Sequence, residues 1–187
     1  MAFIVLYDAC VLYPAPLRDL LMRLARTELF RAKWTTEILD ECFDGIRRQR
    51  PDLDADKLAR TRELMIRAVP DCLVTGYEGL VTSFELPDPD DRHVLAAAVR
   101  AGAQIIVTAN TRHFPDKVLE QFGIETQDAD EFVVNLIDID AAAVAGVVTA
   151  QAADLRNPPT TIEQLLALFE RQGLNRAVAA LRPWLEP

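Results

Sequence analysis

Four side chains that carry oxygen stand where they could bind a cation: Asp8, Glu41, Asp91 and Asn110. Asp8 directly follows the apolar run Phe3–Tyr7, which has the length and composition of a buried strand. Asn110 comes just after a second run of this kind. Parallel sheets bind ligands at the carboxyl ends of their strands, and hard divalent cations prefer oxygen ligands. We therefore expect a cation-binding edge on one sheet.

Asp91 opens a predicted helix whose inward stripe includes Val94 and Leu95, and it lies on that same face. A carboxylate at the head of an apolar face needs compensation by the helix N-terminus, a partner or a cation. Asp88 and Asp90 stand in the same proline-marked loop. Carboxylates this close repel one another unless they are solvated or hold a metal.

Glu41 belongs to a predicted helix that starts at Thr35 or Thr36, either of which can cap it. Its apolar stripe leaves Glu41 on the flank, where it can reach inward. The same pattern directs Glu37 and Asp44 nearly the opposite way. Glu41 is therefore the candidate from this helix.

The elements that must position these residues alternate between strands and helices, which predicts an α/β fold with a parallel sheet covered by helices on both faces. The expected strands are Phe3–Tyr7 and Gln104–Thr108, with Cys72–Thr75 as a further candidate. The expected helices cover residues 16–30, the segment after Thr35, 54–68, 91–101 with Gly102 as its cap, and 116–122.

From about Asp138 onward the sequence contains only helical signals, which predicts an all-helical C-terminal extension of about 45 residues. An alanine-rich helix runs to about Ala153 and is followed by a break at 157–159. Thr160 and Glu163 have the spacing of a capping box that starts the next helix.

The net charge of −9 argues against a nucleic-acid partner if it is taken as an average. Residues 1–70, however, carry 12 Lys/Arg and 11 Asp/Glu, and residues 71–187 carry 8 and 18. The arginine-rich first third could therefore face a polyanion, or its arginines could simply be solvated helix faces.

Composition bounds the class of protein. Half of the 187 residues are apolar, which suffices for a real core. The longest apolar runs, Phe3–Tyr7 and the alanine-rich stretch after Asp140, fall short of the roughly 20 residues of a membrane span. With no basic segment before the first run, we expect a cytoplasmic protein without a membrane partner. Three separated cysteines predict neither a disulfide framework nor a zinc site, and we expect them to be small buried hydrophobes.

Four segments together resemble the PIN domain, and more narrowly the VapC-type ribonuclease toxins of toxin-antitoxin pairs. They are strand-Asp8, the segment 34–41 ending in Glu41, the segment 87–98 containing Asp91, and Ile105-Ile-Val-Thr-Ala-Asn-Thr-Arg-His-Phe114. The resemblance covers residues 3 to 137. It implies a PIN-like nuclease domain at 1–137 and a helical C-terminal extension at 138–187, like that of some family members.

The resemblance implies an endoribonuclease that depends on Mg²⁺ or Mn²⁺, in which a metal-activated water cleaves RNA. Its partners would be an RNA substrate and an antitoxin protein, and a homodimer through the early helices is common in the family. The matching catalytic residues are Asp8, Glu41, Asp91 and Asn110, and the matching metal ligands are Asp8, Glu41 and Asp91. Substrate or loop contacts are expected from Thr108, Arg92, Arg112 and His113.

One departure from the family pattern concerns His113-Phe114, where members often have Asp-Phe. It removes a negative charge beside the site, and Asn110 contributes only a neutral carbonyl, so a second metal position is weakened more than the first.

Other interpretations remain for these residues. Each acid taken singly fits a turn, a cap or a solvated helix position, and the whole could be a catalytically weak or inactive PIN-like binding module. A phosphatase with Asp8 as nucleophile would want a second Asp where Cys10 stands. His93 flanks the Asp91 motif and fits a helix-surface residue at least as well as a general base.

Overall fold

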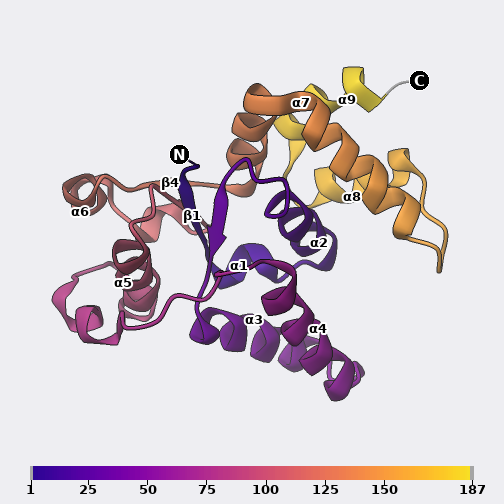
Figure 1. Ribbon diagram of the computed structural model, residues 1–187. Coiled ribbons are helices and arrows are strands. Elements are labelled where there is room, and N and C mark those ends of the chain that lie inside the picture. Colours follow the sequence, from indigo (N-terminus) through magenta and orange to yellow (C-terminus); the bar gives the residue numbers. More distant parts are fainter. Residues whose placement is uncertain (1, 186–187) are drawn as a thin grey trace.

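The computed structural model describes residues 2–185 and centres on a four-stranded sheet in the order β2-β1-β3-β4 (Figure 1). All three strand pairs are parallel. The strands are β1 (Ile4–Tyr7), β2 (Arg31–Lys33), β3 (Ile105–Val107) and β4 (Glu125–Gln127). The parallel sheet predicted from the alternation of strands and helices is confirmed.

The register of the two central strands brings their ends together. Val5 pairs with Ile105 and Tyr7 with Val107. The backbone N–H of Asp8 donates to the carbonyl of Val107 over 3.1 Å. The first residue after β1 therefore lies beside the first residue after β3, which is Thr108.

Sequence patterns found the central strands and missed the edge strands. The segments predicted at Phe3–Tyr7 and Gln104–Thr108 contain β1 and β3. β2 and β4 have three residues each and are largely polar, so no apolar run marks them. The strand expected at Cys72–Thr75 is wrong, because this segment makes only an isolated bridge through Leu73 to Trp34.

Helices lie on both sides of the sheet, with α5 on one side and α2 on the other (Figure 1). Tyr7 packs on α2 and α7, where its ring contacts Phe132 edge-on and its hydroxyl donates to the carbonyl of Leu21. The helices are α1 (Ala9–Leu12), α2 (Ala15–Leu24), α3 (Thr36–Gln49), α4 (Ala55–Ala68), α5 (Arg92–Ala101), α6 (Asp116–Leu119), α7 (Ala129–Asp154), α8 (Ile162–Arg171) and α9 (Asn175–Leu185), with short 3-10 turns η1 (Glu78–Ser83), η2 (Pro89–Asp91), η3 (Thr111–His113) and η4 (Glu120–Phe122).

Local capping signals explain several helix ends. The Thr35 hydroxyl accepts from the N–H of Ile38 at the start of α3, and Gly102 ends α5 in the left-handed conformation with φ of 66°. The capping box that starts α8 is formed by Thr161 and Gln164, one residue later than the predicted pair Thr160 and Glu163. Both spacings fit the motif.

Helix α7 is longer than the sequence predicts, because it begins at Ala129 and not near Asp138. Among residues 2–185 it is the one helix long and apolar enough, by length and composition, to cross a membrane. It also departs from helical geometry at Asp140. Ten of its residues are buried, and it packs against α2, α8 and α9. These contacts make it the core helix of the C-terminal part of the fold (Figure 1).

Candidate active site

The carboxylate of Asp8 is held at the shared end of β1 and β3. Its side chain is 4 % exposed and caps α1 by accepting from the N–H of Ala9. The Thr108 hydroxyl donates to Asp8 Oδ2 over 2.7 Å, and the Cys10 thiol donates to the same oxygen over 3.2 Å. A buried carboxylate needs such partners, and these bonds fix its orientation at the edge of the sheet.

Cys10 takes part in this edge, although the sequence analysis treated it as a small buried hydrophobe. Its Sγ accepts from the N–H of Ala109 over 3.1 Å and lies 3.4 Å from the Thr108 hydroxyl. Burial and the nearby Asp8 raise the pKa of the thiol to about 12, so it remains protonated and serves as a hydrogen-bond donor. Its position two residues after Asp8 was the available sequence signal. Cys42 and Cys72 are buried as expected, and all three cysteines, each within the described chain, are free.

Asp91 lies at the junction of η2 and α5, with its side chain 17 % exposed. Burial raises its pKa, a hydrogen bond from His113 opposes that shift, and the charges of Asp8 and Asp88 raise it further. Asp91 Oδ2 lies 2.7 Å from His113 Nδ1. Asp91 and Asp8 therefore both contact the segment that follows β3, Asp91 through His113 and Asp8 through Thr108.

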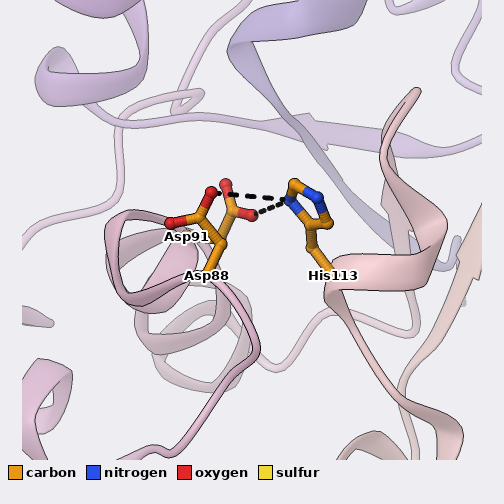
Figure 2. A group of neighbouring side chains, drawn as sticks. All are labelled: Asp88, Asp91 and His113. Carbon is orange, nitrogen blue, oxygen red and sulfur yellow. Dashed lines mark hydrogen bonds and ion pairs between the residues drawn. The ribbon is translucent and has the colours of Figure 1, made fainter.

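Asp88 joins this pair through the same histidine. Its Oδ2 lies 3.8 Å from His113 Nδ1, and the side chains of Asp88, Asp91 and His113 point toward one another (Figure 2). One ligand atom from each residue lies within 4.8 Å of the other two. From the sequence, Asp88 was expected only as one of several crowded loop carboxylates, and His113 as a substrate or loop contact.

Glu41 is tied to His93, whose Nε2 lies 3.0 Å from Glu41 Oε1. His93 is only 6 % exposed, so its interpretation as a helix-surface residue is wrong. Burial lowers the pKa of His93, but the hydrogen bond to Glu41 and the charges of Glu41, Glu37 and Asp8 outweigh that effect and leave the pKa raised. The prediction failed because His93 faces Glu41 and Glu37 of α3, a helix that is distant in the sequence.

Glu37 also approaches this histidine, contrary to the expectation that it points away. Its Oε2 lies 3.6 Å from His93 Nδ1 and accepts from the Tyr77 hydroxyl over 2.9 Å. Residues four apart on a helix are neighbours, so Glu37 stands beside Glu41. Tyr77 was missed because nothing in its local sequence links it to α3.

The remaining predicted residues lie in or next to the segment after β3 and at the start of α5. The Thr108 hydroxyl also accepts from the N–H of Asn110 over 3.0 Å, and the carbonyl of Asn110 accepts from the N–H of His113 over 2.8 Å. Arg112 is exposed and Arg92 is half-buried. Thr108 thus orders this loop, as the resemblance implies.

Two family models match the sequence of this chain. The family model described as PIN domain matches residues 4–112, which hold all four predicted catalytic residues. The chain belongs to the PIN domain family. A second family model, described as VapC50 C-terminal domain, matches residues 129–183 of this PIN protein. No solved structure matches the PIN protein with significant similarity.

Among curated proteins, the PIN protein is similar to "Putative ribonuclease VapC50" of Mycobacterium tuberculosis. The two are 36% identical over 107 residues, which cover 57% of this chain and 63% of the relative. The chain therefore aligns with less than two thirds of that relative's length.

Proposed function

We propose that this PIN protein is an endoribonuclease that depends on a divalent metal ion. The observation that carries the proposal is that Asp8 and Asp91, from distant segments, both contact the segment that follows β3, Asp8 through Thr108 and Asp91 through His113. Parallel α/β folds place their reactive groups at this edge. The name of the relative, a putative ribonuclease, supports the substrate class.

The donor set fits a divalent cation, because oxygen and imidazole nitrogen ligands converge from two segments. Asp8, Asp88, Asp91 and His113 would hold the ion, with Glu41 as a further ligand from α3. Such an ion would lower the pKa of a bound water and neutralise charge that develops on the scissile phosphate.

The protein's own groups position these ligands. Thr108 and Cys10 orient Asp8 through hydrogen bonds to its Oδ2. His93 orients Glu41 in the same way from α5. Outer partners of this kind fix ligand direction and basicity. Asn110 would contribute a neutral amide to this edge, as its match to the family motif implies.

Basic groups near the site would place the RNA backbone. Arg112 follows Asn110 in the loop, and Arg92 follows Asp91 at the start of α5. Their guanidinium groups suit phosphate contacts, which position a nucleic acid without reading its sequence.

We further propose that the protein is the cytoplasmic toxin of a toxin-antitoxin pair, with the nuclease domain at 1–137 and the extension at 138–187. Its antitoxin would place an Arg or Lys among the site carboxylates, since buried charges need a partner of opposite sign. Association into a homodimer through the early helices completes this proposal.

A non-catalytic RNA- or protein-binding module is the second candidate. It is favoured by the neutral Asn110 and by the contact of His113 with Asp91, both of which reduce the negative charge available to a cation. The following assay separates the two functions.

RNA cleavage by the purified full chain tests the proposal. With Mg²⁺ or Mn²⁺ we expect cleavage that EDTA abolishes. Asp8→Asn and Asp91→Asn should each lose at least about a hundredfold in rate, because a catalytic metal supplies several kcal/mol of charge stabilisation. Asp90→Asn removes an exposed neighbouring charge and is the matched control, which should cleave like the wild type. Equal rates in all variants would contradict the nuclease proposal.

A further inference from the structure

The cluster of Asp88, Asp91 and His113 differs from a plain group of surface acids because one of its members is an imidazole. Its nitrogen lies 2.7 Å from Asp91 Oδ2 and 3.8 Å from Asp88 Oδ2 (Figure 2). Ligand atoms at these separations can share one ion, because neighbouring ligands in a coordination sphere are about 3 Å apart when each lies about 2 Å from the metal.

The three side chains come from two segments that the fold holds in place. Asp88 accepts from the N–H of Asp90 at the start of η2, and Asp91 follows at the start of α5. His113 lies in η3, whose end is anchored by Phe114 with 1 % exposure. The imidazole therefore meets the two carboxylates from a separate segment that buried Phe114 anchors.

The nitrogen donor decides which cation suits the cluster. Mg²⁺ prefers oxygen ligands and retains its waters, so an imidazole is a poor replacement for one of them. First-row transition ions accept imidazole readily, and their affinity for a given site rises from Mn²⁺ to Co²⁺ and beyond. A carboxylate at position 113 would make the same cluster all-oxygen.

We propose that His113 is a metal ligand and that, with Asp88 and Asp91, it makes this site select first-row transition-metal ions over Mg²⁺. The inference rests on the proposed nuclease function for the presence of a divalent cation at this edge. It goes beyond that function by assigning the ion class and the residue that sets it.

Binding of Mn²⁺ to the full-length protein, followed by electron paramagnetic resonance with Mg²⁺ and Co²⁺ as competitors, tests the selection. We expect Co²⁺ to displace Mn²⁺ more effectively than Mg²⁺ does. His113→Gln should weaken Mn²⁺ binding at least tenfold, since loss of even an outer partner of a ligand typically costs about 10- to 100-fold. His113→Asp should restore binding and narrow the preference over Mg²⁺. Unchanged affinity and preference in both variants would overturn the proposal.

A nitrogen signal gives a second readout that does not depend on affinity. Pulsed electron paramagnetic resonance of the Mn²⁺-loaded protein should show coupling to an imidazole ¹⁴N. The chain has two histidines, so the assignment needs two variants. The coupling should vanish in His113→Gln and persist in His93→Gln. Coupling that is absent from the wild type, or that survives in His113→Gln, would refute ligation by His113.

Matched carboxylate variants locate the ion within the loop. Asp88→Asn should weaken Mn²⁺ binding, whereas Asp90→Asn, which removes the same charge outside the cluster, should leave it unchanged; equal effects of the two would contradict the assigned ligand set. Circular dichroism confirms that each variant is folded.

The inference and the nuclease proposal fail separately. Mn²⁺ ligation by His113 without RNA cleavage would refute the nuclease function alone. RNA cleavage that requires Asp8, together with Mn²⁺ binding that is unchanged in His113→Gln, would refute the inference alone.

Discussion

The edge of the sheet at Asp8 and the C-terminal helices α7 to α9 solve opposite problems. The edge gathers carboxylates and histidines from β1, α3, α5 and the loop after β3, and partners them through polar contacts. The C-terminal helices bury apolar side chains such as Val148, Phe169 and Leu181 against one another and against α2. The edge holds like charges close together, which costs folding free energy, and the C-terminal helices stabilise the fold through apolar burial.

The difference teaches where stability and function separate in this molecule. Apolar burial stabilises the fold, and protein interiors are closely packed. Truncating a buried side chain in these helices should therefore lower the free energy of unfolding. Ionised carboxylates held close together disfavour the folded state, so removing one should have the reverse sign. Substitutions in the two regions can break or sharpen this contrast.

Phe169→Ala is expected to have the largest effect on stability. The ring is fully buried in α8, and such truncations cost about 3–5 kcal/mol of unfolding free energy. Urea denaturation of the full chain measures the loss. Trp184→Ala in α9 is the control, because its side chain is 56 % exposed and should cost little. A loss no larger than that of the control would show that the helices do not supply stability.

Thr108→Val should have a smaller effect that originates in the site. The substitution keeps the shape and removes the hydroxyl that bonds Asp8 Oδ2 and the N–H of Asn110. Leaving buried polar groups unpartnered costs about 1–3 kcal/mol. Thr111→Val, at an exposed position, is the matched control. Equal stability of the two variants in the same denaturation assay would argue against the role of Thr108 in holding this edge.

Asp91→Asn should have the smallest effect and the opposite sign. Burial raises the pKa of Asp91 in the folded protein above its ordinary value of 3.8. The protonated carboxyl therefore contributes stability that is fully present below pH 3.8 and is lost as the pH rises through the higher pKa of the folded state. In EDTA, Asn at this position should therefore become more stabilising, relative to the wild type, as the pH rises from acid to neutral. Thermal unfolding across this range tests the trend, and Asp90→Asn should not show it. If the wild type instead became more stable relative to Asp91→Asn as the pH rises, this prediction would be contradicted.

Local signals in the sequence predicted the elements that are built from local interactions. The hydroxyl of Thr35 and the left-handed Gly102 set helix ends through contacts within a few residues, so their positions followed from spacing alone. The apolar runs of β1 and β3 likewise predicted the central strands, because each run consists of consecutive residues. Asp8 could be placed at the carboxyl edge of the sheet because it directly follows a central strand.

The missed contacts depend on segments that are distant in sequence. His93 is buried and faces Glu41 and Glu37 of α3, and no pattern within α5 encodes these contacts. Cys10 and Tyr77 acquire their roles from Thr108 and Glu37, which lie far along the chain. The edge strands β2 and β4 were invisible because strand pairing, and not an apolar run, defines them.

Anomalous diffraction from crystals grown with Mn²⁺ tests the central claim most directly. We predict a peak within coordination distance, about 2.0–2.6 Å, of carboxylate oxygens from both Asp8 and Asp91. A peak bound by one of these residues while the other points away, or no peak at this edge in crystals that contain Mn²⁺, would contradict the claim that the two distant carboxylates share an ion.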